Sequence, residues 1–394
     1  MDVNNSKFVG FSFGIYLQYK CEGNINRTEF VNNTVAIHMG LSEANITNNN
    51  FVFSREINLE IFESANTTIK GNYIGDATIW GMILGYSHDI IIKDNEFHSS
   101  GVFITGSDSS HFNNFTITGN TINGKPLMYV VGTSDTTITG NIGELILVEC
   151  ENITVSDMVM SDTDVGIEMA FCSDITITGS AFDDIRYGVY MYYCDTINVE
   201  ETSLSESEKA IYAISTVTTI TGVEVFNSSA GIVLENSNGT IYGVSVSASG
   251  FATQVFGSNA TIESMTVEGN AYGVSVSADS NVEIENSEFA NNSFYAVSIE
   301  DSVAYIMNIT AKNNEEGIEM KSSEVEVRNS TLSENEKYGV YSWESEFKIY
   351  YSWITGNEYG IYADKTAGYI WYSDIYGNSL HGIYNLATDV EYMI

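Results

Sequence analysis

The chain has 394 residues, 43% of them hydrophobic, and its 52 Asp and Glu residues outnumber 15 Lys and Arg residues to give a net charge of −37. This charge disfavours nucleic acid and an anionic membrane surface as partners, because both bind to cationic faces. It fits a solvated acidic coat, which suits a salty or extracellular setting and the binding of cations. Since no apolar run of about 18 residues is present, we expect no membrane span.

The amino-terminal segment, Met1-Asp2-Val3-Asn4, lacks the basic and apolar regions of a signal peptide. The sequence starts directly inside a repeat, and an uncapped solenoid end would expose a sheet edge. We therefore expect a fragment or the mature form of an extracellular or cell-surface protein.

The clearest repeat runs from Gly166 to Cys194. Its opening phrase, Gly166-Ile167-Glu168-Met169, returns 22 residues later as Gly188-Val189-Tyr190-Met191. A small residue followed by an apolar–x–apolar triplet recurs along the chain, at Gly14, Ala36, Gly81, Gly101, Gly166, Gly188, Ala210, Gly231, Ala252, Gly273, Ala296, Gly317, Gly339, Gly360 and Gly382. A fixed period near 22 residues, built from alternating strands, is typical of a solenoid.

Three short strands fill each repeat and leave no room for a helix, which predicts the turns of a parallel β-helix. We expect an all-β fold of about 17 or 18 turns in one domain, residues 1–394. The spacing is disturbed near Pro126, where we expect an irregular loop over about residues 105–150 that bulges from the tube and is not a domain boundary.

Two sets of residues recur at the repeat spacing and predict ladders at the bends. Stacked amides can hydrogen-bond from turn to turn, and the candidates are Asn50, Asn72, Asn95, Asn120 and Asn141. Cys150, Cys172 and Cys194 are one repeat apart. We interpret these cysteines as small buried apolar residues, with a disulfide and a metal site as the open alternatives.

Phrases such as Ile175-Thr176-Ile177-Thr178-Gly179-Ser180 and Tyr338-Gly339-Val340-Tyr341 carry a resemblance that covers nearly the whole chain. They resemble the right-handed parallel β-helix repeat of pectate-lyase-like proteins, of periplasmic copper-maturation (NosD-like) proteins and of many archaeal and bacterial surface proteins. The resemblance implies a right-handed parallel β-helix. It predicts no activity, because this scaffold hosts lyases, hydrolases, epimerases, adhesins and wall components.

Carboxylates gather on successive turns before Gly188. The candidate catalytic residues are Asp162, Asp183, Asp184, Arg186 and Glu206. A glycoside hydrolase needs one protonated acid and one ionised base or nucleophile, and a lyase could use Ca²⁺ on carboxylates with an Arg base. The alternative interpretation is a solvated acidic turn with one ion pair. The complete motifs of known β-helix lyases, polygalacturonases and epimerases are absent. The histidines share no repeat position, so we expect no metal site from them.

Aromatic residues concentrate in the carboxy-terminal turns, residues 338–394. We expect them to stack on sugar rings or to form an interface with a neighbouring copy or domain, and the candidates are Tyr341, Trp343, Trp353, Tyr362, Trp371 and Tyr384. Tyrosine also simply fits a half-exposed strand.

Asn-x-Ser/Thr sequons are frequent and make the chain a candidate glycoprotein. The candidate glycosylation sites are Asn26, Asn66, Asn114, Asn152, Asn227, Asn259, Asn308 and Asn329.

The leading hypothesis is an extracellular or cell-surface structural or adhesive protein, such as a surface-layer, wall or spacer component. Its expected partners are a surface glycan or neighbouring copies or domains, and Ca²⁺ is the candidate ion. The alternative is a polysaccharide lyase, a glycoside hydrolase or a carbohydrate-binding module that uses the acidic turns. A metal-delivery role like that of the NosD-like proteins is a third hypothesis, weakened by the shortage of ordered His, Met and Cys ligands.

Overall fold

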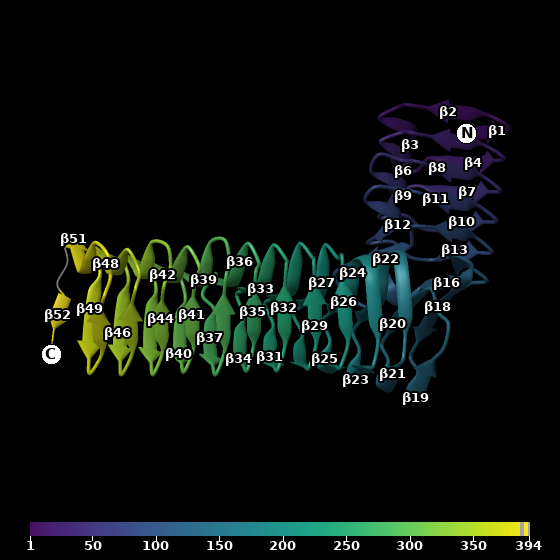
Figure 1. The fold of residues 1–394 in the computed structure, drawn as a ribbon. Helices are drawn as coiled ribbons and strands as arrows, with labels where there is room; N and C mark the ends of the chain where they lie inside the picture. Colours follow the sequence, from purple (N-terminus) through teal and green to yellow (C-terminus); the bar gives the residue numbers. More distant parts are fainter. Residues whose placement is uncertain (387–389, 393–394) are drawn as a thin grey trace. The chain divides into compact units, whose positions relative to one another are not determined.

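The computed structural model describes residues 1–386 and 390–392. They form two compact units, Met1–Cys194 (unit 1) and Asp195–Ile394 (unit 2). Both units are built from stacked turns of parallel strands (Figure 1). The chain forms about 18 turns with a repeat of roughly 22 residues, which confirms the predicted all-β solenoid.

Unit 1 begins with a stack in which three strands per turn form three parallel sheets. The first sheet contains β1 (Asp2–Asn4), β4 (Glu22–Asn26), β7 (Glu43–Thr47), β10 (Thr67–Lys70), β13 (Ile90–Lys93) and β16 (Phe115–Thr118). The second contains β2 (Lys7–Val9), β5 (Glu29–Val31), β8 (Asn50–Val52), β11 (Tyr73–Gly75), β14 (Glu96–His98) and β17 (Thr121–Ile122). The third contains β3 (Phe13–Gln18), β6 (Val35–Gly40), β9 (Ile57–Phe62), β12 (Trp80–Gly85) and β15 (Val102–Thr105).

A second stack completes unit 1 after the short helix α1 (Ser110–Asn113). Its longer strands are β18 (Lys125–Val131), β20 (Glu144–Val148), β22 (Val159–Ala170) and β24 (Ala181–Tyr192). Its second sheet has β19 (Ser134–Thr139), β21 (Glu151–Ser156) and β23 (Ser173–Thr178).

Unit 2 repeats the three-strand turn with little variation. Its first series is β25 (Asp195–Glu200), β28 (Val217–Thr221), β31 (Asn238–Tyr242), β34 (Asn259–Glu263), β37 (Asn281–Glu285), β40 (Val303–Met307), β43 (Glu324–Arg328), β46 (Glu346–Tyr350), β49 (Ala367–Trp371) and β52 (Val390–Tyr392). The second is β26 (Ser203–Ser205), β29 (Glu224–Phe226), β32 (Ser245–Ser247), β35 (Thr266–Glu268), β38 (Glu288–Ala290), β41 (Thr310–Lys312), β44 (Thr331–Ser333), β47 (Trp353–Thr355) and β50 (Asp374–Tyr376). The third is β27 (Lys209–Ile214), β30 (Ala230–Glu235), β33 (Phe251–Phe256), β36 (Tyr272–Ser277), β39 (Tyr295–Glu300), β42 (Glu316–Lys321), β45 (Tyr338–Trp343), β48 (Tyr359–Asp364) and β51 (His381–Leu386).

The interior of each stack is a column of like side chains, because strands pair in register from turn to turn. Phe30 and Phe51 are fully buried, and their rings stack at 4.8 Å with an interplanar angle of 9°. The residue before each apolar triplet is small because the backbone of the next turn approaches it closely. A Cβ at Gly166 would lie 2.6 Å from the carbonyl oxygen of Gly188, and one at Gly317 would lie 2.4 Å from that of Gly339.

Buried asparagines form the predicted ladder in unit 1, with one shift in register. The amide of Asn72 accepts from the backbone N–H of Asn49 at 2.8 Å and donates to the carbonyl of Ile46 at 2.9 Å. The ladder continues through Asn95 to Asn120. The prediction of Asn50 was wrong by one residue, because Asn50 is exposed at the start of β8 whereas Asn49 is 3% exposed. Asn141 is also exposed and not a buried member.

Unit 2 has further polar ladders that the sequence analysis did not identify. Serine hydroxyl groups accept the backbone N–H of the preceding turn, as in Ser237 to Ser258 at 2.9 Å and Ser258 to Ser280 at 3.1 Å. A second asparagine ladder joins residues Asn270, Asn292, Asn314, Asn335, Asn357 and Asn378. These side chains give the bends hydrogen-bond partners inside the stack.

All four cysteines are free thiols, so the disulfide alternative is not the observed state. Cys150, Cys172 and Cys194 are 1–3% exposed. Their thiols donate to backbone carbonyls at 3.4–3.5 Å. A hydrogen bond to Cys172, together with burial, raises the pKa of the Cys150 thiol. Cys21 is half-buried and donates to the carbonyl of Gln18.

The region 105–150 differs from the expected bulging loop, because most of it is strand. Positive φ angles at Asn123 (49°) and Gly124 (78°) reverse the chain. Strand β18 therefore runs antiparallel to β17, with Ile122 opposite Lys125. It then pairs in parallel with β20. The disturbed spacing thus marks the start of the second stack.

Replacing Asn72 by Ala tests the ladder. The change leaves the N–H of Asn49 and the carbonyl of Ile46 without their partners inside a dry bend, so we expect the free energy of unfolding to fall by about 3 kcal/mol. The exposed residue Asn45 is the control, and Asn45→Ala should change stability by less than about 0.5 kcal/mol. Denaturant unfolding measures both variants, and equal losses would contradict the role of the ladder.

Thiol labelling of the native protein tests the cysteine environments. Burial protects Cys150, Cys172 and Cys194, whereas the half-buried Cys21 is open to reagent. We expect one thiol per chain to react with an aromatic disulfide reagent in buffer and the other three to react only after denaturation. The variant Cys21→Ser should show no fast phase. Rapid reaction of a second thiol would contradict the buried column.

Candidate functional site

The predicted acidic turn is partly assembled in unit 1. Strands β22 and β24 pair in parallel with Ser161 opposite Asp183, so Asp162 and Asp184 occupy equivalent positions on adjacent turns. Asp162, Asp183 and Asp184 are exposed. Glu206 belongs to unit 2 and is exposed directly after β26. The three aspartates of unit 1 therefore form an open acidic surface.

Arg186 contacts the segment that precedes β12. Its Nε donates to the carbonyl of Ile79 at 2.8 Å, and its Nη2 donates to that of Thr78 at 2.7 Å. Its guanidinium also lies 5.1 Å from the ring centroid of Trp80, a distance typical of a cation–π contact. The side chain therefore fastens β24 to the beginning of β12.

Three acidic side chains that face β15 form the least expected cluster, which we call the corner carboxyls: Glu144, Asp164 and Glu168. All three are 0–5% exposed. β15 ends the sheet that begins with β3, so one edge of this strand lacks a neighbouring strand. The corner carboxyls occupy that edge.

Each corner carboxyl accepts backbone hydrogen bonds. Both oxygens of Glu144 lie 3.2 Å from the N–H of Val102, and those of Glu168 lie 3.2–3.3 Å from the N–H of Ile104. Asp164 Oδ2 accepts from Gly81 at 2.7 Å and from Gly101 at 2.8 Å. Side chains from β20 and β22 thus replace the missing strand.

Burial raises the pKa of all three corner carboxyls. Desolvation raises that of Glu144 well above its usual value, and the neighbouring Asp164 and Glu168 raise it further. Desolvation likewise raises the pKa of Glu168. The pKa of Asp164 rises only to about 6, because two backbone N–H groups and Arg186 stabilise its charge.

Aromatic packing seals the same junction. Phe103 stacks on Trp80 at 4.5 Å and meets the rings of Tyr187 and Tyr190 edge-on at 5.7 and 5.1 Å. The repeat pattern predicts an outward, exposed Tyr190, and this is wrong, since Tyr190 is 3% exposed. The side chain does point outward from its own stack, but β15 covers it.

A histidine–glutamate pair lies on the outer face of β3, β6 and β9. His38 Nδ1 is 2.6 Å from Glu60 Oε2, and the His38 ring stacks on Tyr16 at 4.5 Å. Tyr16, His38 and Glu60 are aligned in register, 22 residues apart. The sequence analysis missed this column, although the spacing could have revealed it.

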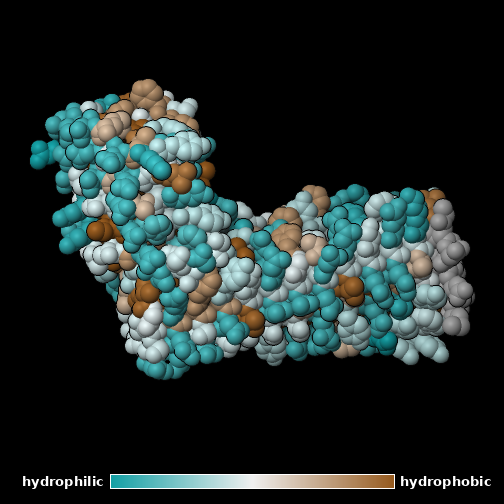
Figure 2. All heavy atoms as spheres, turned by 180° about the vertical axis from the view of Figure 1, so that it is seen from behind, coloured by the Kyte–Doolittle hydropathy of each residue, from teal (hydrophilic) through white to brown (hydrophobic). Residues whose placement is uncertain are grey.

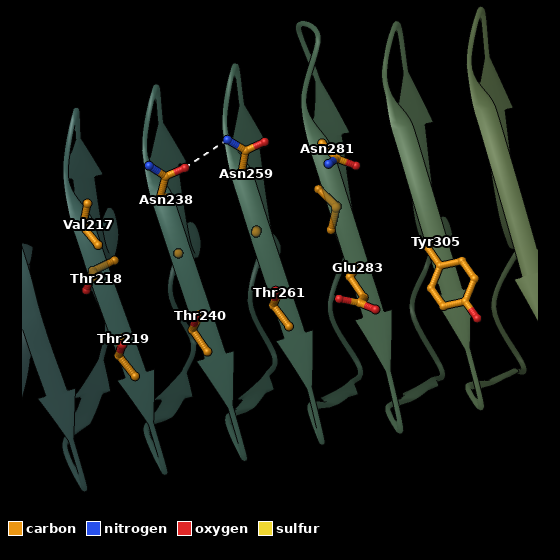
Figure 3. Close-up of a pocket in the computed structure, with 13 residues that line it drawn as sticks. Val217, Thr218, Thr219, Asn238, Thr240, Asn259, Thr261, Asn281, Glu283 and Tyr305 are labelled. Atoms are coloured by element: carbon orange, nitrogen blue, oxygen red, sulfur yellow. Dashed lines mark hydrogen bonds between the residues drawn. The ribbon is translucent and has the colours of Figure 1, made fainter.

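A shallow groove crosses the outer face of five strands in unit 2, β28, β31, β34, β37 and β40 (Figure 3). Its hollow has a volume of about 490 Å³, within the range of ligand pockets. Two columns of side chains line it. One column contains Val217, Asn238, Asn259 and Asn281, and the other contains Thr219, Thr240, Thr261, Glu283 and Tyr305.

The groove is polar and carries little charge. Asn259 donates to the amide oxygen of Asn238 at 3.0 Å, which fixes the orientation of both side chains (Figure 3). Glu283 is the one ionisable carboxylate among the described lining residues, and Tyr305 ends the threonine column. Amides and hydroxyls both donate and accept hydrogen bonds. Such a row suits a ligand rich in hydroxyl groups.

The carboxy-terminal aromatic residues stack mainly on one another. Tyr341 and Tyr362 lie 5.5 Å apart at 15°, and Tyr362 and Tyr384 lie 5.3 Å apart at 29°. Tyr350 and Trp371 are separated by 4.8 Å at 6°. Stacking along the solenoid covers ring faces and turns ring edges toward solvent. These rings therefore offer fewer free faces to a sugar than their number implies.

The two remaining aromatic candidates differ in their surroundings. Trp353 is 46% exposed on β47. Trp343 is half-buried, with the ammonium of Lys365 5.7 Å from its ring centroid. Figure 2 shows a largely hydrophilic face on which apolar residues are scattered. Isolated apolar side chains of this kind are ordinary on a protein surface.

Glu316 is a carboxyl beside the tyrosine face. Burial raises its pKa to about 7, and the neighbouring Glu319 and Glu315 add to the rise. Its Oε2 is buried without a hydrogen-bond partner. Glu319, three residues further along β42, pairs with Lys321 at 2.5 Å and accepts from Ser298 at 2.7 Å. Two nearby carboxyls therefore have unlike environments.

The candidate glycosylation sites are mostly accessible. Seven of the asparagines are exposed, namely Asn66, Asn114, Asn152, Asn227, Asn259, Asn308 and Asn329. Asn26 is half-buried and bonded to Asn4, Thr47 and Asn48.

Within residues 1–386 and 390–392, no group of three or more His, Cys, Asp or Glu side chains could hold a metal ion. No helix in the same described part of the chain is long and apolar enough to cross a membrane.

Several solved proteins are similar to this chain at low sequence identity. The A-module of mannuronan C-5 epimerase AlgE6 from Azotobacter vinelandii is 12% identical, with a TM-score of 0.38, over 68% of this chain and 91% of the module. Tailspike protein 3 of bacteriophage CBA120 is 10% identical, with a TM-score of 0.42, over 88% of this chain and 56% of the tailspike chain. The PL6 family alginate lyase AlyGC is 7% identical, with a TM-score of 0.28, over 100% of this chain and 96% of the lyase chain.

No curated protein matches the sequence. The profile of the family described as "Periplasmic copper-binding protein (NosD)" matches residues 129–255. The profile of the family described as "Right handed beta helix region" matches residues 1–142 and 250–393. Since the latter profile covers more than half of the sequence, the chain belongs to the right-handed β-helix family.

Proposed function

We propose that the protein is an extracellular or periplasmic adhesive β-helix that binds a neutral polysaccharide in the groove of unit 2. The observation that carries this proposal is the pair of adjacent columns in the groove, with three stacked amides (Asn238, Asn259 and Asn281) beside three stacked threonines (Thr219, Thr240 and Thr261). Stacked strands lie about 4.8 Å apart, so the groove presents the same polar groups at a short, regular interval. A linear polymer of sugars can meet such a surface repeatedly.

Charge favours a neutral ligand over an acidic one. The chain has a net charge of −37, and this field repels polyanions. Within the groove, Glu283 is the ionisable carboxylate, and Thr219, Thr240 and Thr261 are neutral. Sugar hydroxyl groups can replace the water that solvates the three threonines without a charge being desolvated.

A structural role at the cell surface is compatible with this binding. Internal ladders leave the outer columns free to vary, and the six exposed sequon asparagines outside the groove could carry glycans. Contacts with neighbouring copies or domains through the aromatic turns belong to the same proposal. Each groove contact is weak, so adhesion would depend on many contacts along one polymer.

A second candidate function is glycoside hydrolysis at the tyrosine face. It is favoured by the unlike environments of Glu316, whose pKa is about 7, and Glu319, which is paired with Lys321. A protonated acid beside an ionised carboxylate is the arrangement that hydrolases use. In this reaction Glu316 would protonate the leaving oxygen, and Glu319 would serve as base or nucleophile.

The double variant Thr240→Val/Thr261→Val tests binding in the groove. It removes two hydroxyl groups and keeps the β-branched shape, so we expect binding to a retained neutral polysaccharide to weaken about 10- to 100-fold. The matched control is Thr154→Val/Thr176→Val, which changes the equivalent column of unit 1. Affinity electrophoresis through neutral and acidic polysaccharides measures retention. Equal weakening by both variants, or retention by acidic polymers alone, would contradict the proposal.

Product analysis tests the hydrolase candidate. If Glu316 acts as the acid, the wild type shortens a polysaccharide with a rate that falls as pH rises above about 7, where Glu316 loses its proton. Glu316→Gln should then lower the rate at least about 100-fold, while Glu324→Gln, at an exposed position, should leave it unchanged. Unchanged chain length with wild-type protein would exclude this candidate.

A further inference from the structure

The corner carboxyls perform no step in the proposed binding, yet they are the most deeply buried acidic cluster of unit 1. Glu144 and Glu168 bind the free edge of β15, and Asp164 binds Gly81 of β12 and Gly101, the residue before β15. We propose that the contact between the corner carboxyls and β15 depends on pH. In the closed form, Glu144 and Glu168 bind β15 as neutral carboxylic acids. At alkaline pH they ionise, and the contact breaks to give the open form.

The charge balance at the corner supports this proposal. Arg186 of β24 is the cation that acts on Asp164. The corner carboxyls on β20 and β22 act on one another, since Asp164 and Glu168 both influence Glu144. Three ionised carboxylates would place like charges close together in a buried junction. Burial of an unpaired charge is costly, so a buried carboxyl takes up a proton instead.

Aromatic side chains and backbone N–H groups of neighbouring strands in unit 1 surround the corner. Tyr129 of β18 interacts with Glu168 and Glu149, and its hydroxyl donates to the carbonyl of Phe112. Tyr187 and Tyr190 of β24 contact Phe103 of β15 through their rings. β12 supplies the backbone N–H of Gly81, and β15 supplies those of Val102 and Ile104. Thr163 of β22 donates its hydroxyl to Glu144 Oε2 at 3.2 Å.

The direction of the pH effect follows from the raised pKa values. Below about pH 4, the open and closed corners both carry the protons, so pH has little influence. Above that pH, the open form loses protons that the closed form retains. For each carboxyl, the closing equilibrium constant then falls up to tenfold per pH unit until the closed form ionises as well. The corner is therefore tightest in acid and weakens toward alkaline pH.

Two readouts report on the corner in the full chain. Trp80 is 8% exposed and packed against Phe103 and Arg186. A Trp343→Phe/Trp353→Phe/Trp371→Phe background leaves Trp80 as the one tryptophan of the sequence. Hydrogen exchange of the Val102 and Ile104 amides reports on their bonds to Glu144 and Glu168. Exchange in β34 and β37 of unit 2 serves as the internal reference.

Between about pH 5 and pH 10, we expect protection of the β15 amides, corrected for intrinsic rates, to fall at least tenfold. Trp80 emission should move to longer wavelength while β34 and β37 stay protected. In Glu144→Gln/Glu168→Gln this pH dependence should disappear. The single variants should act locally, with Glu168→Gln affecting Ile104 and Glu144→Gln affecting Val102, which keeps the test available if the double variant does not fold.

Glu151→Gln, at an exposed position on β21, is the control and should titrate like the wild type. The proposal is overturned if β15 in the wild type keeps constant protection from about pH 5 to about pH 10. It is also overturned if the glutamine variants lose protection with pH as steeply as the wild type.

Discussion

Hydrogen bonding from each turn to the next is the constraint on which the whole structure depends. Within a stack, each strand supplies the backbone hydrogen-bond partners of the strands in the adjacent turns. At the bends, side chains such as Asn72 and Ser258 supply these partners through their amide and hydroxyl groups. The backbone groups of a strand find partners in this way only where another turn follows. β15 has no following strand in its sheet, and Glu144 and Glu168 take that place. A buried acidic cluster is thus the consequence of ending a sheet inside the protein.

The same constraint separates structure from function along the outer faces. Because the inward side chains and the bends carry the stability, the outward columns can hold almost any residue that tolerates a strand. Unit 2 uses this freedom in two ways. Threonine and asparagine columns leave a polar groove, whereas the tyrosine columns stack ring on ring and mostly cover their own faces. The groove is therefore the better surface for an external ligand, and the aromatic columns add rigidity to the last turns.

The repeat could be predicted from the sequence because its cause is local: a small residue fits where the next turn's carbonyl approaches, and alternation sets the buried face. The burial of the corner carboxyls could not be predicted from the sequence. Gly166-Ile167-Glu168-Met169 and Gly317-Ile318-Glu319-Met320 share the same four residue types, yet Glu168 is fully buried whereas the Glu319 side chain remains 13% exposed beside Lys321. What differs is a strand more than 60 residues away, Val102–Thr105, that covers the first glutamate. The exposure of the predicted acidic turn follows from the repeat. The hydrogen bonds from Arg186 to the carbonyls of Thr78 and Ile79, by contrast, join residues more than 100 positions apart and could not be predicted from it.

A crystal structure of the full chain with an oligosaccharide from a retained neutral polysaccharide tests the central claim most directly. The account predicts sugar rings over β31, β34 and β37, with hydroxyl groups bonded to Thr240, Thr261 and Asn259. Sugar bound instead over Glu316 and the tyrosine columns, or over Asp162 and Asp184 on the acidic turn, would contradict the assignment of the groove as the binding surface.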